Sequence, residues 1–245
     1  FADDAFVAML SEQAMRGPTD LVIAGDFFEF WQVVAGLRRD GRLPARDASA
    51  ADRHGGATER EAQTALAAIV AAHPDAVRAL GRFVDRGDHR VIIVPGNHDA
   101  ELGWPWVQRD LAAATGAAAL DRLVFVDAAA AQIGPVWIEH GHQRDGANAF
   151  ARGHAPFVAR AEGCALEANW GDVFVDAFYS DVERTWPFID NLIPESAGIA
   201  WAFAESPDRA HQAQAVVGFL RLLTQVQPGE FNWRTAMGAL HLAYV

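Results

Sequence analysis

Three short apolar stretches of the sequence each end in side chains that could bind a metal ion or move a proton. Asp26 follows LVIAG, Asn97 and His98 follow VIIVPG, and His140 follows VWIE. In open α/β sheets, binding sites form at the carboxyl ends of the strands. If the three stretches are strands of such a fold, we expect these side chains to meet at one edge.

The candidate ligands Asp26, Asn97 and His140 combine a carboxylate, an amide oxygen and an imidazole. Such mixed sets suit Mn, Fe, Zn or Co. A carboxylate can bridge two ions, and two divalent ions about 3.5–4 Å apart would generate hydroxide at neutral pH and clamp a phosphoryl group for in-line attack. Two ions need more donors than three residues supply. Candidates to fill in, as ligands or as neighbours of ligands, are Glu29, His142 and Asp145.

His98 and Asp99 predict a second function for the same turn. A histidine beside a carboxylate can act as a general acid or hydrogen-bond an oxyanion, because the carboxylate favours the charged imidazole. We therefore expect His98 and Asp99 to be the catalytic residues. Asn148 and His54 are weaker candidates for contact with the substrate, and a solvated loop histidine is the more ordinary interpretation of His54.

Alternating strand and helix patterns predict an α/β core that would position these residues. The fully apolar runs 21–24 and 91–94 are typical of buried strands that are covered on both faces. Residues 122–127 and 131–142 are predicted to form one further strand each. Helices are predicted at 4–16, after a capping-box pattern at Thr58–Glu61, from Pro74 to about 84, and at 105–114.

Between these elements, residues 38–57 are rich in Arg, Asp, Gly and Ala and are expected to form a long polar loop, which contains His54. His89 directly precedes a predicted strand and is expected to be exposed.

The second half of the chain has a different character, with no clear strand pattern from Asn148 onward. Helices are predicted at about 171–180, 197–205, 207–224 and 233–243. We therefore expect an α/β core over residues 1–147 and a mainly helical cap or insertion over residues 148–245. Its aromatic residues, such as Trp170 and Trp186, either pack in the core of the cap or line a groove for an acyl chain or a membrane surface.

Composition excludes several classes of function. The net charge of −12 argues against duplex nucleic-acid binding by phosphate neutralisation, although bound cations would let an acidic protein hold an anionic substrate. All twenty basic residues are arginine, which excludes a P-loop and any Schiff-base enzyme. The single cysteine, Cys164, excludes an internal disulfide and a cysteine-based zinc site. It fits a reducing compartment, so the cytoplasm is the expected location.

The motifs GDFFE, GNHD and HGH, in this order, resemble the calcineurin-like metallophosphoesterase superfamily. The family pattern is D-x-H, G-D-x-x-D, G-N-H-D/E, a lone His and G-H-x-H, each at a strand end of an α/β/β/α sandwich. Three of these five blocks are present and cover residues 21–148. GNHDAELGWPWVQ and IEHGHQRDGANAF further resemble a bacterial capped subgroup, similar to UDP-2,3-diacylglucosamine pyrophosphohydrolases. The resemblance implies a four-layer α/β/β/α metallophosphoesterase sandwich with a helical cap.

The resemblance also implies roles for the candidate residues. Asp26 would bridge two divalent metal ions, and Asn97 and His140 would be further ligands. His98 would be the catalytic or phosphate-contacting imidazole, with Asp99 as its partner. The pyrophosphohydrolases commonly have Arg where His98 stands, which leaves the substrate open.

Other positions depart from the family pattern. Glu29 replaces the second Asp of the GD block and is expected beside the ligands rather than among them. His142 is either a neighbour of a ligand or a ligand. The D-x-H block would precede Phe1 and the G-H-x-H block would follow Val245, so the chain is expected to be cropped, at the N-terminus in particular.

We therefore expect a dinuclear metal-dependent phosphoesterase or pyrophosphohydrolase acting on a small phosphorylated or lipid-diphosphate substrate. A lipid-linked substrate would bring peripheral contact with the inner membrane. One alternative is a non-catalytic metallophosphoesterase-like binding module that lacks the end motifs. Another is a nuclease of the same superfamily, against which the acidic composition counts. The sequence makes no prediction of oligomeric state.

Overall fold

The computed structural model describes residues 2–44, 55–127, 130–160 and 163–169, and the single residues 171, 172, 183 and 186. The chain divides into two compact units, residues 1–169 and 170–245. Nearly all of the second unit, including the predicted helices of the cap and its aromatic residues, lies outside the described residues. The account below therefore concerns the first unit.

A three-stranded parallel sheet forms the centre of this unit. Its strands are β1 (Asp20–Ala24), β3 (Arg90–Val94) and β4 (Leu123–Phe125), in the order β1-β3-β4. In the β1–β3 pair Ala24 lies opposite Val94, so the two strands end side by side. This register confirms the predicted strands and brings the residues that follow them to one edge.

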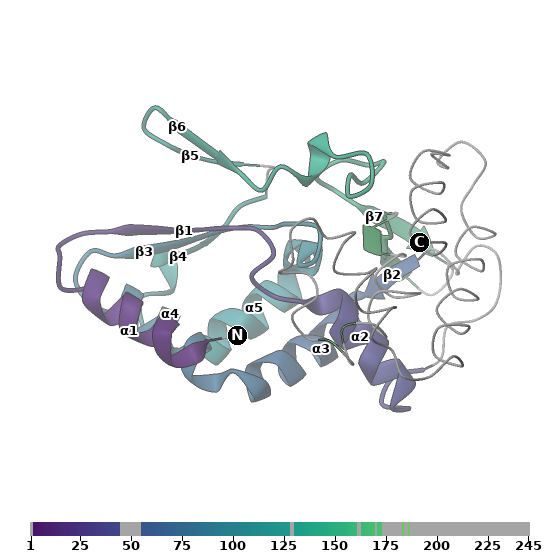
Figure 1. The fold of residues 1–245 in the computed structure, drawn as a ribbon, viewed down its shortest axis with the longest axis horizontal. Helices are drawn as coiled ribbons and strands as arrows, with labels where there is room; N and C mark the ends of the chain where they lie inside the picture. Colours follow the sequence, from purple (N-terminus) through teal and green to yellow (C-terminus); the bar gives the residue numbers. More distant parts are fainter. Residues whose placement is uncertain are drawn as a thin grey trace. The chain divides into compact units, whose positions relative to one another are not determined.

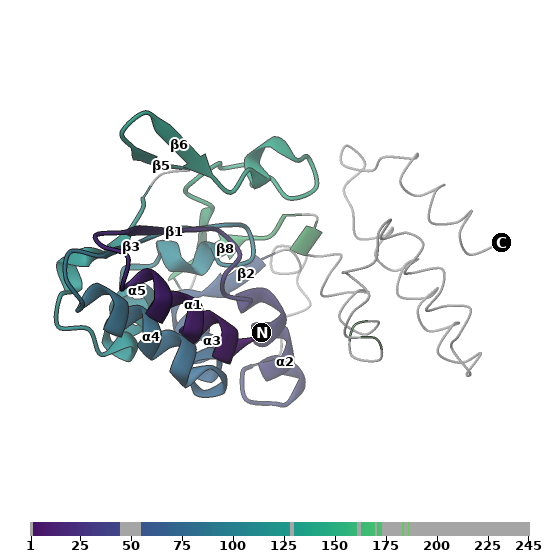
Figure 2. The ribbon, with the colours of Figure 1, turned by 60° about the vertical axis from the view of Figure 1, so that its left-hand side comes forward.

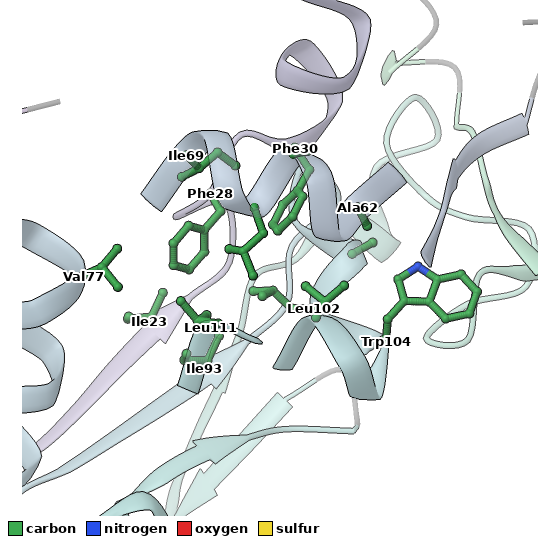
Figure 3. Packing of buried hydrophobic residues seen from close by; sticks show 14 of the residues in the cluster. Ile23, Phe28, Phe30, Ala62, Ile69, Val77, Ile93, Leu102, Trp104 and Leu111 are labelled. Carbon is green, nitrogen blue, oxygen red and sulfur yellow. The ribbon is translucent and has the colours of Figure 1, made fainter. Parts of the chain in front are cut away.

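Five α-helices of the described part lie on one side of the sheet (Figures 1 and 2). They are α1 (Asp3–Gln13), α2 (Phe30–Arg39), α3 (Glu59–Ala72), α4 (Pro74–Val84) and α5 (Pro105–Thr115). Ile23 and Ile93 point from the strands into a core with Phe28, Phe30 and Leu111 (Figure 3). Phe30, Ile93 and Leu111 are completely buried. Burial of such side chains stabilises the fold by about 1.5–3 kcal/mol each.

A β-hairpin covers part of the opposite face of the sheet (Figure 1). It consists of β5 (Ala130–Ile133) and β6 (Val136–Glu139), which pair antiparallel. The expectation of one strand over 131–142 was wrong, because Gly134, with φ 57°, and Pro135 turn the chain back. Ile92 and Val94 of β3 pack with Ala131 of β5. Strand β3 is therefore covered on both faces, as its continuous apolar sequence predicted.

A third sheet contains strands that the sequence patterns did not predict. Its order is β2-β8-β7, and both pairings are antiparallel. The strands are β2 (Gly55–Thr58), β7 (Phe157–Arg160) and β8 (Gly163–Glu167). The expected absence of strands after Asn148 and the expected loop over all of 38–57 were therefore wrong. The sequence GGAT of β2 has little strand propensity, so its conformation comes from pairing with β8, far away in the chain.

Short 3₁₀ turns follow β3 and β6 and precede β4. They are η1 (Ala100–Gly103), η2 (Leu120–Arg122) and η3 (His142–Arg144). The predicted capping box is confirmed, since Thr58 and Glu61 bond reciprocally at the start of α3.

His89 is only 3% exposed, contrary to expectation, because it stacks on Phe83 and contacts the Ala14 carbonyl. No helix among the described residues is long and apolar enough to cross a membrane.

Candidate functional site

The turns after β1 and β3 cross at very short range, and glycine makes this possible. A Cβ atom at Gly96 would collide with the Asp26 carboxylate, and one at Gly25 would collide with the His140 ring. Asp26 has φ 52° and is the one non-glycine residue with positive φ in the described part of the chain. Non-glycine residues rarely adopt this conformation, and such strain clusters at functional sites.

Asp26, Asn97 and His140 converge on one point, as the sequence predicted. His140 Nε2 lies 3.0 Å from Asp26 Oδ2 and 3.3 Å from Asn97 Oδ1. Asn97 is 6% exposed, whereas the Asp26 and His140 side chains are partly exposed. A carboxylate, an amide and an imidazole from three different turns therefore face one another at the surface.

The orientation of His140 fits a metal ligand. Its Nδ1 lies 2.9 Å from the Ala24 carbonyl oxygen, to which only an Nδ1–H group can donate. Ligating histidines commonly donate their other ring N–H to a carbonyl in this way. Nε2 then faces the oxygens of Asp26 and Asn97, and only a proton or a cation between them makes that arrangement favourable. The three donors therefore suit a divalent ion.

The same contacts shift the acid–base behaviour of the pair. The hydrogen bond to Asp26 raises the pKa of His140 above its ordinary value, against the opposing effect of burial. Burial acts to raise the pKa of Asp26, but hydrogen bonds from His140 and the His98 backbone N–H outweigh it and lower that pKa. Both shifts favour the charged pair, so a cation that binds His140 Nε2 must displace the proton of that nitrogen.

His98 is paired with Glu29 rather than with its predicted partner Asp99. Nδ1 of His98 lies 2.5 Å from Glu29 Oε2. The other carboxylate oxygen of Glu29 accepts the N–H of Gln32 and so caps α2, while the His98 carbonyl accepts the N–H of Phe30. Glu29 therefore orients the imidazole and is itself held by the first turn of α2.

Asp99 bonds to the backbone of both the turn after β1 and the turn after β3. It is completely buried and accepts backbone N–H groups from Gly96 at 2.5 Å, Phe27 at 2.9 Å and Phe28 at 3.4 Å. Burial raises the pKa of Asp99 to about 6, although the bond from Gly96 acts in the opposite direction. The carboxylate joins the turn after β1 to the turn after β3. The prediction that Asp99 is the partner of His98 was therefore wrong, because Glu29 takes that position and Asp99 bonds to the backbone.

His142 lies beside the converging side chains. It is 7% exposed, and its ring centroid is 5.3 Å from that of His140 and 5.6 Å from that of Phe150. Burial, followed by the neighbouring His140, lowers the pKa of His142 to about 4. Its Nδ1 atom is buried and has no hydrogen-bond partner among the described residues.

The remaining predicted site residues lie elsewhere. Asp145 caps its own turn by accepting the Ala147 N–H and the Asn148 side-chain amide. The Asn148 carbonyl accepts from Asn169. His54 lies outside the described residues. His154 lies in the loop before β7, within the region predicted to be a helical cap, and lines a pocket with His142.

Within the part of the chain that the structure describes, no three His, Cys, Asp or Glu side chains gather to hold a metal ion. The converging set contains only two residues of these types, and the amide of Asn97 is the third donor. Sequence reasoning also missed Asp127, which lines the same cavity as His142. A signal was present, because Asp127 follows the apolar run LVFV directly, as Asp26 follows a strand.

Comparison with known proteins adds no relative. No family model matches the chain, and neither the curated proteins nor the solved structures contain a significant match.

Proposed function

We propose that the protein is a dinuclear metal-dependent hydrolase of phosphoric esters or anhydrides, of the calcineurin-like metallophosphoesterase superfamily. The observation that carries the proposal is the convergence of Asp26, Asn97 and His140 on one point, with the His140 ring held by the Ala24 carbonyl. The motif order in the sequence supports the same assignment.

Asp26, Asn97 and His140 would hold the metal. Two ions need donors beyond these three. Divalent ions, when bound, supply positive charge for the phosphoryl oxygens and acidify water. The family assignment also carries the finer architecture, in which β5–β6 belongs to the second sheet of a four-layer sandwich and the cap is formed by residues from 170 onward. The single cysteine supports a cytoplasmic location, and a lipid-linked substrate would bring contact with the inner membrane.

His98 and Glu29 would handle the proton. Because Nδ1 of His98 is bonded to Glu29, proton delivery falls to the other ring nitrogen, Nε2. In the reaction a water oxygen bonds to phosphorus and releases one proton to solvent, the bond from phosphorus to the leaving oxygen breaks, and the leaving oxygen takes a proton from His98. Water then returns a proton to the imidazole. The carboxylate of Glu29 stabilises the charged ring before the transfer.

The proposal is tested on the intact protein by metal analysis and by Mn²⁺-dependent hydrolysis of a bis-aryl phosphate. We expect Asp26→Ala and Asn97→Ala to abolish turnover while the circular-dichroism spectrum and the unfolding transition persist. Asp121→Ala, a change at an exposed residue, is the control. Turnover at the wild-type level in Asn97→Ala would overturn the assignment. Absence of stoichiometric metal in the wild-type protein would favour a non-catalytic binding module.

A further inference from the structure

The ring of His140 is restrained by more than its hydrogen bonds. Both of its nitrogens face oxygen atoms of neighbouring residues. The ring also lies so close to the backbone of the turn after β1 that a Cβ atom at Gly25 would collide with it. Among the described residues, the aromatic ring that packs against His140 is that of His142, with a centroid distance of 5.3 Å and an interplanar angle of 45°.

Packing holds the ring of His142 itself. This side chain is 7% exposed, and its Nδ1 atom is buried without a hydrogen-bond partner in the described part of the chain. Its ring centroid lies 5.6 Å from that of Phe150, at an interplanar angle of 80°. Aromatic pairs favour such an edge-to-face arrangement. Phe150 is 6% exposed and belongs to the main hydrophobic core, so the rings of His140, His142 and Phe150 connect the proposed metal centre to that core.

The local backbone brings the two imidazoles together. Strand β6 ends at Glu139, and Gly141 then has a left-handed conformation with φ 99° before the 3₁₀ turn η3 begins at His142. Glycine adopts this conformation without the steric cost that a Cβ atom brings. The chain therefore leaves the strand at Gly141 and places the ring of His142 beside that of His140.

A contact with the ring restrains a motion that the hydrogen bonds of His140 leave open. The Ala24 carbonyl fixes the direction of one nitrogen, Nδ1, but it leaves the plane of the imidazole free to tilt about that bond. A neighbouring ring opposes the tilt, because aromatic surfaces in a packed interior have little space to move. A metal-binding histidine depends on such restraint, and loss of a residue that orients one typically costs 10–100-fold in metal affinity.

We propose that His142 is a positioning residue of the reaction centre, which holds His140 by ring packing in the orientation that binds the metal ion. This role rests on the proposed metal-dependent function and extends the residues on which metal affinity depends to His142 and, behind it, Phe150. Of the two roles that the sequence left open for His142, it is the neighbour of a ligand. The ring, and neither of its nitrogens, is then the part that matters.

Mn²⁺ affinity of the full chain, measured from the paramagnetic resonance signal of the free ion, tests this role. We expect His142→Ala to raise the Kd by about 10-fold, whereas His142→Phe, which keeps a ring, stays within about 2-fold of the wild type. His154→Ala, at an exposed histidine nearby, is the control and keeps the wild-type Kd. A loss in His142→Phe as large as in His142→Ala would overturn the proposal, because it would assign the role to a ring nitrogen.

A double-mutant cycle tests the path through His142 with a second variant. Phe150→Leu keeps an apolar side chain but removes the ring behind His142, and we expect it to raise the Kd by about 3-fold in the wild-type chain and to add nothing in His142→Ala. Equal effects of Phe150→Leu in both backgrounds would mean that Phe150 does not act through His142. His142→Leu, which fills more of the space than alanine, repeats the comparison without a ring and is expected to resemble His142→Ala.

A measurement on metal-free protein separates failure of this role from failure of the proposed function. In protein with ¹⁵N-labelled histidine, the ring signals of His140, assigned with His140→Gln, report the bond from Nδ1 to the Ala24 carbonyl. We expect these signals to move in His142→Ala and to stay in place in His142→Phe. Moved signals without stoichiometric metal binding by the wild type would retain the positioning contact and reject the metal-dependent function. Metal binding by the wild type with unmoved signals in His142→Ala would do the reverse.

Discussion

Asp26 and Asp99 follow neighbouring strands in similar sequence contexts, yet they differ in exposure, backbone conformation and bonding partners. Asp26 is partly exposed, has a strained backbone with φ 52° and faces His140. Asp99 is completely buried and accepts three backbone N–H groups. Interactions lower the pKa of Asp26, whereas burial raises the pKa of Asp99.

The difference separates the residue that meets a ligand from the residue that holds the turn. The carboxylate of Asp99 satisfies backbone donors of both turns and so sets the distance between them. Asp26 can then remain in an unfavourable conformation, because the surrounding turns are fixed without it. The strain at Asp26 and the buried bonds of Asp99 are therefore two parts of one arrangement.

The largest effect is expected from Asp99→Ala. Its removal leaves three buried N–H groups without acceptors, and each costs about 1–3 kcal/mol. We expect the free energy of unfolding to fall by about 3–5 kcal/mol, measured by urea denaturation. Asp26→Ala, the same change at the other aspartate, serves as the control and should cost less than about 1 kcal/mol. A loss of similar size in both variants would remove the distinction between them.

Glu29→Gln is expected to affect catalysis more than stability. The glutamine oxygen can still accept the Gln32 N–H and cap α2, but its neutral amide no longer stabilises a charged His98. We expect kcat with a bis-aryl phosphate to fall by about 10-fold to 100-fold, as for impaired general acid catalysis. The unfolding midpoint should stay near that of the wild type. Glu12→Gln, on the exposed face of α1, is the matched control, and a fall in kcat of the same size there would contradict the role of Glu29.

Glu61 provides a reference for a carboxylate that is structural and charged. Burial acts to raise its pKa, but bonds from the Thr58 N–H and from Arg38 outweigh this and lower it. A lowered folded-state pKa means that its stabilisation is present above the unfolded value of 4.5 and is lost as pH falls through the folded value. We expect Glu61→Gln to cost about 1–1.5 kcal/mol at pH 7 and the two unfolding curves to converge under acid. A difference that is constant from pH 7 to pH 3 would rule out this linkage.

The smallest effect isolates the backbone strain at Asp26. Asp26→Ala and Asp26→Gly both remove the carboxylate and its bonds to His140 and the His98 N–H. Only glycine adopts positive φ without steric cost. We expect the glycine variant to be more stable than the alanine variant by about 0.5–1 kcal/mol in urea denaturation. At Asp121, whose φ is not positive, we expect the alanine variant to be more stable than the glycine variant. Equal stability of the two Asp26 variants would mean that the turn relaxes.

Local patterns predicted the elements that are specified by their own residues. The apolar runs before Asp26 and Asn97 are parallel strands, of which β3 is buried and β1 is mostly half-buried, and the Thr58–Glu61 capping box begins α3. The convergence of Asp26 and Asn97 follows from the same patterns, because parallel neighbours end at one edge. Strand β2 could not be predicted in this way, since its sequence lacks strand-forming residues and depends on β8.

The sequence by itself determined which residue types stand at the strand ends, because an apolar run and the polar turn after it are both written locally. Only the tertiary structure decided which groups are paired. Asp99 directly follows His98 in the sequence and Glu29 lies 69 residues before it, but the position of α2 brings Glu29 to the imidazole while burial ties Asp99 to the backbone. The cavity beside His142 likewise exists only because β3, β4 and the loop before β7 meet there. Which side chains bond to one another depends on their distance and burial in the fold, and a local sequence pattern specifies neither.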